Sequence, residues 1–412
     1  MKPFRIITNR APASCAVGAL CAVAITACGG GGSASSSSPS SSSSSSPSTS
    51  MTTAFADTAL VANREMGYAT STVIDANLQN PWGIAVGPGL PFWIADNNAN
   101  IATLYSGTGE IETQEITGSA DVGVAIPASA AAVQANPTGQ VYNGSSAFEV
   151  PTSKGQEPAM FIYDGEGGTI SGWAIDSGST TMTAYDDGVA NGANHAVYKG
   201  LAIGAVDGAS YLYATDLHNN KVDVFDTNFA KPAAMQGKFV DPGIPSGFVP
   251  FGIAAVKDQL YVTFTKQDAA KHDEVTGAGL GYVDIFDMSG NFVSRFASQG
   301  TLNAPWGIAV APAGFGPIEG EVLIGNFGDG KINTFTPNGA ELATSVGPLL
   351  DVNGQPITFP GLWSLAFGNG DSDKPLTTLF YTAGFADQTD GLFGSITMST
   401  TTTTTTPTTP GY

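Results

Sequence analysis

A short motif recurs along the chain, and its spacing limits the possible folds more than any other feature of the sequence. The two clearest copies, Asn80–Val86 and Ala304–Val310, share the run Pro-Trp-Gly-Ile-Ala-Val. Weaker copies with a related pattern lie at Tyr198–Ile203, Val249–Ala254 and Pro360–Ala366. Self-similarity at a nearly constant period indicates a repeat architecture, in which each copy is one structural unit.

The spacing of the copies predicts how many there are. The glycines at 200, 252 and 307 are 52 and 55 residues apart. The interval from Gly83 to Gly200 is about two such periods, so one degenerate copy belongs between them, and we place it near Gly144–Val150. The sequence therefore predicts six units of roughly 55 residues.

Each unit reads as a series of short strands. The motif is followed by a second apolar strand that ends in a polar turn, as in Phe92–Ala95 before Asp96. A third strand with period-two alternation follows, as in Lys221–Asp226. This order predicts an all-β fold, a single six-bladed β-propeller of four-stranded antiparallel blades. We expect the N-terminal segment 59–74 to complete the last blade and close the ring, which removes an exposed edge.

The N-terminus has the pattern of a bacterial export signal. Lys2, Arg5 and Arg10 precede a short apolar run that is too brief to span a bilayer. The run ends in Ile25–Cys28, which resembles the lipobox of bacterial lipoproteins, and the resemblance implies a lipid on Cys28. The alternative is an ordinary signal peptide that happens to contain a cysteine.

Composition divides the chain into four parts. We assign 1–28 to the signal, 29–56 to a Ser/Gly-rich disordered tether, 57–397 to the propeller and 398–412 to a Thr-rich disordered tail. All three cysteines lie in the signal, so the mature domain has no disulfide. Residue 29 is glycine rather than aspartate, which by analogy with lipoproteins favours the outer membrane within the bacterial cell envelope. A Gram-positive host stays open.

The charge limits the partners. The net charge is −20, and it is −23 without the three basic residues of the signal. Such an acidic surface opposes nucleic-acid binding and suits cationic partners or divalent ions. We expect a monomer that contacts the membrane only through its lipid. Its expected partner is an extracellular ligand or an envelope protein.

The motif also carries a resemblance to known families. Pro81–Ala85 followed by Phe92–Asn97 resembles NHL-repeat propellers and the wider SMP-30/gluconolactonase-like six-bladed group. More closely, the chain is similar to an uncharacterised family of secreted bacterial propellers, some of which occur with the PEP-CTERM sorting system. This likeness covers 73–396 and implies the fold, but it implies no activity, because that family has none established.

Antiparallel geometry predicts where a site would lie. The loop that enters the first strand and the loop that leaves the second strand end at the same face of a blade. The residues expected to rim one mouth of the central channel are therefore Trp82, Asp96, Asn97, Asn98, Asp216, His218, Asn219, Trp306, Asn326 and Asp329. The alternatives are that the Asp and Asn side chains cap their own turns and that the tryptophans pack between blades.

The sequence establishes no cofactor, and calcium is the one candidate that it offers. Asp96, Asn98 and Asn100 alternate oxygen-bearing side chains, as hard cations prefer, although the glycine and glutamate of an EF-hand are absent. The resemblance to gluconolactonases implies a ring of Glu, Asn and Asp around a divalent ion, yet no copy has a glutamate at the start of its inner strand.

The sequence favours binding over catalysis. It has no Gly-x-Ser-x-Gly turn, and His195, His218 and His272 fall in different copies. We therefore expect a non-enzymatic binding or scaffold module, and the alternative is a divalent-metal-dependent hydrolase or lyase. The insertion 265–279 is read either as a functional loop or as a solvated flap, and the insertion 118–142 either as a lid or as a disordered excursion.

Overall fold

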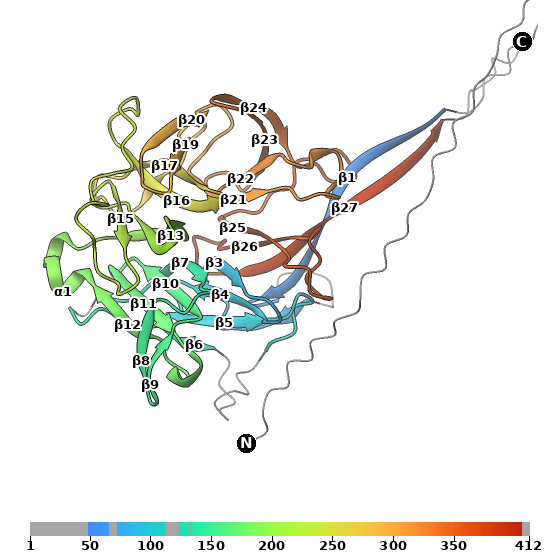
Figure 1. Cartoon of the computed structure of the whole chain (residues 1–412). Helices are drawn as coiled ribbons and strands as arrows, with labels where there is room; N and C mark the ends of the chain where they lie inside the picture. Colours follow the sequence, from blue (N-terminus) through green and yellow to red (C-terminus); the bar gives the residue numbers. More distant parts are fainter. Residues whose placement is uncertain (1–47, 66–71, 113–122, 132, 406–412) are drawn as a thin grey trace, which may run out of the picture. The chain divides into compact units, whose positions relative to one another are not determined.

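Six short strands carry the copies of the motif and line a common axis in the part of the chain that the structure describes (Figure 1). This computed structural model describes residues 48–65, 72–112, 123–131 and 133–405. The inner strands are β3 (Pro81–Val86), β7 (Pro137–Tyr142), β13 (Tyr198–Val206), β16 (Phe248–Val256), β21 (Pro305–Val310) and β25 (Leu362–Phe367). Each begins an antiparallel sheet, so the six-bladed β-propeller is confirmed.

The remaining strands follow outward from each inner strand. Blade 1 continues with β4 (Phe92–Asp96), β5 (Ile101–Tyr105) and β6 (Val124–Ala125), and blade 2 with β10 (Phe161–Gly165), β11 (Thr169–Trp173) and β12 (Met182–Asp186). Blade 3 has β14 (Ala209–Asp216) and β15 (Lys221–Phe225). Blade 4 has β17 (Gln259–Gln267), β19 (Tyr282–Asp287) and β20 (Phe292–Ser298), and blade 5 has β22 (Val322–Asn326), β23 (Ile332–Asn338) and β24 (Glu341–Pro348).

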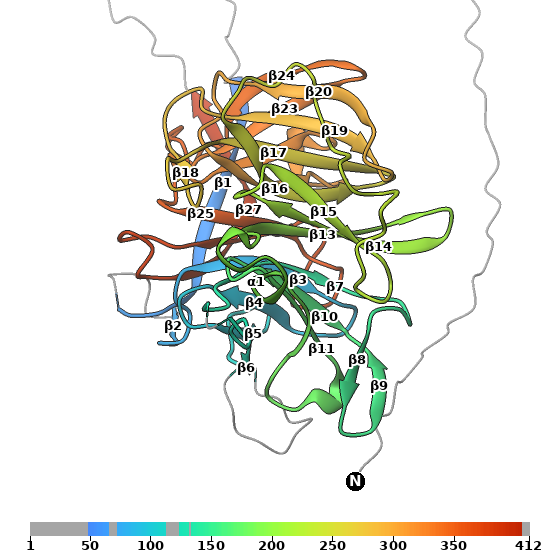
Figure 2. The same ribbon diagram turned by 90° about the vertical axis from the view of Figure 1, so that its left-hand side faces the viewer.

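Two blades differ from the expected pattern. The inner strand of blade 2 is β7, which lies before the range 144–150 where the degenerate copy was placed, because Val141 and Tyr142 pair with Ile162 and Phe161 of β10. Residues 149–158 instead form a separate hairpin of β8 (Glu149–Thr152) and β9 (Gly155–Pro158), visible in Figure 2. Blade 3 has three strands, since the following segment 226–247 contains three prolines, which cannot donate to a strand ladder.

The ring is closed by the N-terminal strand, as predicted. In blade 6, β25 is followed by β26 (Leu379–Ala383), β27 (Leu392–Thr405) and then β1 (Ser48–Ala62) as the outer strand. The short strand β2 (Val73–Ile74) adds to β1 in parallel. Val61 and Ala62 of β1 are fully buried, so the closing strand contributes to the core as well as to the ladder.

The closing strand is longer than the range 59–74 suggested. β1 pairs with β27 along its whole length, from Ser48 opposite Thr405 to Ala62 opposite Leu392. The two strands run side by side in Figure 1. These strands extend past the expected propeller limits of 57 and 397. Residues 1–47 and 406–412, which include the signal and Cys28, lie outside the described residues, so the division into signal, tether and tail stays a prediction.

The glycine of the motif is explained by the contact between neighbouring inner strands. A Cβ atom on Gly252 would lie 2.2 Å from the carbonyl oxygen of Trp306, and one on Gly307 would lie 2.4 Å from that of Trp363. A side chain at either position would therefore collide with the backbone of the next blade. The close approach of one inner strand to the next thus depends on this residue in the five blades that have it.

Helices are short in the described part of the chain. The α-helix α1 (Asp187–Asn191) and the 3₁₀ turns Ile175–Ser177, Gly192–Asn194 and Gly316–Ile318 make up the helical segments there. None of the helices among the described residues has the length and apolar character needed to cross a bilayer.

Candidate functional site

The residue before the motif glycine, or before Ser364 in the last copy, supplies the rings that pack together at the axis. At this position four blades carry an aromatic side chain: Trp82, Phe251, Trp306 and Trp363. Trp82 stacks on Trp363, and the ring centroid of Trp306 lies 5.9 Å from that of Trp82. These rings form an apolar plug, because Phe251 and Trp82 reach each other from opposite sides of the ring.

The two remaining blades have polar side chains at the axial position. Blade 2 has Thr138, whose hydroxyl donates to Asp164 at 2.8 Å, and blade 3 has Lys199. Only 1% of the Lys199 side chain is exposed. Its Nζ lies 5.3 Å from the centre of the Trp82 ring, and its backbone carbonyl accepts a hydrogen bond from Trp306 Nε1 at 2.7 Å. A buried ammonium therefore sits beside the aromatic plug.

Lys199 is paired with carboxylates from the two neighbouring blades. Glu166, in the turn between β10 and β11, accepts a hydrogen bond from its Nζ through Oε1. Asp273, in the long loop of blade 4, accepts another through Oδ1 at 3.2 Å. Asn97 Nδ2 donates to the second oxygen of Glu166 at 3.2 Å, so both oxygens of that carboxylate have a partner.

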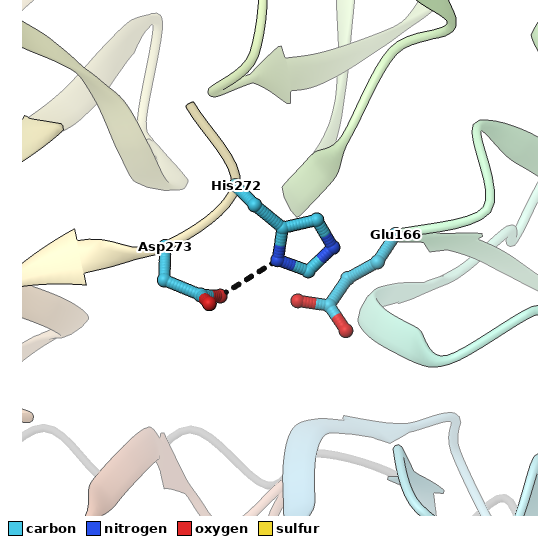
Figure 3. Close-up of side chains that lie close together, drawn as sticks. All are labelled: Glu166, His272 and Asp273. Carbon is cyan, nitrogen blue, oxygen red and sulfur yellow. Dashed lines mark hydrogen bonds and ion pairs between the residues drawn. The ribbon is translucent and has the colours of Figure 1, made fainter. Parts of the chain in front are cut away.

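The long loop of blade 4 brings an imidazole to the same place. This loop contains the short strand β18 (Glu274–Val275), which pairs with the end of β17. Figure 3 shows His272 between Asp273 and Glu166, with its Nδ1 2.9 Å from Asp273 Oδ1. We name Glu166, Lys199, His272 and Asp273 the mouth cluster. Lys199 lies at the start of the inner strand β13, and the other three residues lie in loops at this end of the channel.

Burial and charge shift the pKa values of these groups. Burial alone would lower the pKa of Lys199, but the charges of Glu166, Glu274 and Asp273 raise it above its usual value. The hydrogen bond from His272 lowers the pKa of Asp273, and the same contact raises the pKa of His272. Burial raises the pKa of Glu274 to about 7. The cluster thus combines a permanent cation with an ionised carboxylate.

Two of the aspartates predicted at the mouth turn into their own blades instead. Asp96 is fully buried, and its Oδ2 accepts hydrogen bonds from the backbone N–H and the hydroxyl of Thr103, at 3.1 and 2.7 Å. Asp216 is also buried and accepts from the backbone N–H groups of Val197 and Asn219. These contacts agree with the capping alternative, and ligand binding by Asp96 and Asp216 stays a prediction that they do not favour.

The three residues proposed for calcium have separate partners. The carboxylate of Asp96 lies inside the blade, whereas Asn98 Nδ2 donates to the Gln388 carbonyl at 2.6 Å. Asn100 Oδ1 accepts from the backbone N–H of Asn136 at 2.9 Å. Calcium binding by Asp96, Asn98 and Asn100 stays a prediction, which these separate partners do not favour.

The other predicted residues lie in turns around the mouth. Asn97 reaches the mouth cluster through Glu166. The remaining contacts are within or between turns: His218 Nδ1 lies 3.1 Å from the Lys271 carbonyl oxygen, Asn219 Nδ2 donates to Asp216 Oδ2 at 2.8 Å, and Asn326 Nδ2 donates to Asp329 Oδ1 at 3.0 Å. Trp82 and Trp306 are buried in the plug, which agrees with a packing role. They pack against other aromatic rings at the axis rather than between the faces of neighbouring blades.

A cavity lies along the central channel beyond the aromatic plug. It has a volume of about 270 Å³ and is lined by the later residues of the six inner strands, among them Ile84, Gln140, Leu201, Ile253 and Ile308. Most of these side chains are apolar, so this end of the channel lacks the convergent charges of the mouth cluster.

The repeat contains a signal for Lys199. When the copies are aligned on the motif glycine, or on Ser364 where the last copy lacks it, lysine stands where four copies have Trp or Phe. His272 and Asp273 lie in the insertion 265–279, which was read either as a functional loop or as a flap. Nothing in the sequence marked Glu166, because its position in a tight turn resembles that of many solvated glutamates.

The comparisons with known proteins concern the fold and the family. No family model matches the sequence. Among solved structures, the chain is similar to the soluble aldose sugar dehydrogenase of Escherichia coli, with 14% identity and a TM-score of 0.49 over 83% of this chain and 99% of the other. It is also similar to virginiamycin B lyase from Staphylococcus aureus, with 15% identity and a TM-score of 0.44 over 84% and 99%. At these identities the likeness concerns the fold alone.

Sequence relatives come from a virus. The uncharacterised protein L690 of Acanthamoeba polyphaga mimivirus is 30% identical over 343 residues, which cover 82% of this chain and 84% of the relative. The uncharacterised protein R648 of the same virus is 32% identical over 341 residues, or 82% and 78% of the two chains. The narrower resemblance to bacterial propellers of the PEP-CTERM type stays a prediction. Because the identity extends over most of each chain, the protein belongs to the same family of propellers as R648 and L690.

Proposed function

We propose that the protein is an extracytoplasmic, lipid-anchored propeller that binds a cationic ligand at the mouth cluster. The observation that carries this proposal is the position of Lys199, a buried charge at the axis where four other blades carry an aromatic ring. Burying a lysine is costly unless its charge is paired and hydrogen-bonded. The carboxylates that pair with it come from the two flanking blades, so the charge arrangement is built into the scaffold.

The charge of the cluster favours a cation. Glu166 and Asp273 bring two carboxylates and Lys199 compensates one of them, so the cluster has one negative charge in excess when the His272 imidazole is neutral. The Asp273 side chain is 60% exposed, whereas Lys199 is covered, so the negative side of the pairs faces solvent. A ligand that approaches the mouth therefore meets carboxylate oxygens and an imidazole before it can reach the ammonium. The net charge of −20 adds attraction over longer distances.

The binding proposal can be tested by thermal shift on the intact folded chain. Spermidine and a lysine-rich tripeptide are the cationic probes, and citrate and maltose are the anionic and neutral controls. We expect the cationic probes alone to raise the unfolding midpoint and Glu166→Gln and Asp273→Asn to abolish the shift. Asp329→Asn, which removes a carboxylate from another turn at the mouth, is the matched control and should keep it. Equal shifts in all variants would overturn the proposal.

The proposed lipid anchor is based on the segment Ile25–Cys28 and its resemblance to a lipobox. In a bacterial host grown with an alkyne analogue of palmitate, the full chain should acquire the label and sediment with membranes. Cys28→Ala should lose both properties, and Cys21→Ala, which changes a cysteine within the signal, should keep them. Labelled Cys28→Ala protein would contradict the anchor without affecting the binding proposal.

A second candidate function is a divalent-metal-dependent hydrolase or lyase. The observation that favours it is the convergence of one imidazole and two carboxylates at the mouth, since such groups bind metals and transfer protons. Turnover of lactone or glycan substrates that requires both a divalent ion and His272 would establish it. Binding of those substrates without turnover would leave the binding module as the function.

A further inference from the structure

Three groups that can bind a metal ion meet in the mouth cluster. One ligand atom each from Glu166, His272 and Asp273 lies within 4.8 Å of the other two. Glu166 comes from the second blade, and His272 and Asp273 come from the fourth. The geometry points to a binding site for a first-row divalent transition ion at these three residues, an inference that rests on the proposed binding function and specifies its ligand.

The donor set distinguishes between classes of metal ion. Calcium and magnesium prefer oxygen ligands, whereas zinc, manganese, cobalt and nickel readily combine an imidazole with carboxylates. The cluster supplies one nitrogen and two carboxylates. A transition ion therefore fits it better than calcium, and the site differs from the turn at Asp96, Asn98 and Asn100 that the sequence favoured for calcium.

The surrounding contacts hold the carboxylates in place. Asn97 donates to Glu166 Oε2 at 3.2 Å, and Lys199 Nζ contacts its Oε1, so the side chain is oriented from two sides. Lys199 and His272 both contact the same oxygen of Asp273, Oδ1. The neutral amide of Asn97 orients Glu166 without adding a charge, and loss of such a hydrogen bond weakens metal binding. An ion bound by His272 and Asp273 would replace the hydrogen bond between them.

The charge of Lys199 affects how tightly the mouth cluster binds a metal ion. Its ammonium contacts two of the three ligand residues, so its positive charge opposes a bound cation at short range. Replacing it with the neutral methionine removes this repulsion, while Glu166 keeps its contact with Asn97 and Asp273 keeps its contact with His272. We therefore expect Lys199→Met to bind the ion more tightly than the parent chain, the reverse of what loss of a ligand would do.

The inference can be tested by titration calorimetry on the full chain, purified without a histidine tag. ZnCl₂ and MnCl₂ should each bind with one equivalent, and CaCl₂ should bind at least tenfold more weakly. His272→Ala and Glu166→Gln should lower the affinity for zinc by roughly 100-fold. The matched controls Asn98→Ala and Asp329→Asn should leave it unchanged, and the unfolding midpoint shows which variants are folded.

Several outcomes would overturn the inference. One is the absence of zinc and manganese binding. Another is equal affinity for zinc in His272→Ala and the parent chain. A third is unchanged affinity in Lys199→Met, which would place the ion away from the cluster. The proposed function fails separately. If spermidine shifts the midpoint in a manner that depends on Glu166 while no metal binds, the metal inference alone is wrong. If Glu166→Gln affects neither probe, both are wrong.

Discussion

Replacing Lys199 with methionine tests whether the buried charge at the axis is a structural requirement. Methionine keeps most of the apolar stem but removes the ammonium, which leaves Glu166, only 13% exposed, without its cationic partner. Removing one partner of a buried ion pair typically costs about 3 to 5 kcal/mol. The Asp273 side chain is 60% exposed and can be hydrated, so we place the cost near the lower limit, at about 3 kcal/mol.

Two further variants separate charge from packing. In Lys199→Met combined with Glu166→Gln, no carboxylate is left buried at that position, and we expect at least about 1 kcal/mol of the loss to return. Lys331→Met is the matched control, because Lys331 pairs with Asp329 and both side chains are partly exposed, at 39% and 30%. Its loss should cost at most about 1 kcal/mol.

Urea unfolding followed by tryptophan fluorescence is a suitable assay, since Trp82 lies beside Lys199 and reports on the same region. The reasoning would be refuted by a Lys199→Met variant within about 0.5 kcal/mol of the parent chain, because the ammonium could not then be desolvated as the structure shows. A double variant no more stable than Lys199→Met would also contradict it.

Three other perturbations test the fold. Gly252→Ala places a Cβ atom 2.2 Å from the Trp306 carbonyl oxygen and should cost about 2 to 3 kcal/mol in urea unfolding, whereas Gly144→Ala, with its nearest contact at 3.3 Å, should stay within about 1 kcal/mol. Burial raises the pKa of Asp96 well above its ordinary value, so the folded chain retains a proton that the unfolded chain loses, and stability should fall as the pH rises above about 4. Asp96→Asn should flatten this slope in thermal melts between about pH 4 and 7, and equal slopes would refute the assignment. Deleting 48–62 removes the buried Val61 and Ala62 and should prevent folding as judged by circular dichroism, while a chain that begins at Ala54 should fold.

The repeat allowed much of the fold to be predicted because local sequence decides strand pattern and period. The motif glycines determined the period, and the polar turns determined where strands end. The prediction was weakest where one copy departs from the consensus. Blade 2 has Thr138 in place of the aromatic residue, so its inner strand was placed several residues too late. Blade 3 has one strand fewer than predicted, because the prolines in the segment after β15 cannot donate to a strand ladder.

The candidate site was predicted only in its location. The sequence indicated which loops share a face, since antiparallel strands alternate direction, and Asn97 does contact the mouth cluster. It did not indicate which side chains point to the axis. Asp96 and Asp216 were predicted to contact a ligand, but Asp96 accepts a hydrogen bond from the backbone of Thr103 in β5 and Asp216 accepts one from Asn219 in its own turn.

The sequence by itself determined the repeat, the strand order and the six-fold arrangement, because these follow from local pattern and spacing. Tertiary structure alone decided the site. Glu166, Lys199 and His272 are 33 and 73 residues apart along the chain and belong to three successive blades, so they meet only when these blades pack side by side. Closure of the ring brings β1 against β27 from opposite ends of the chain, a contact that the period of the repeat cannot specify.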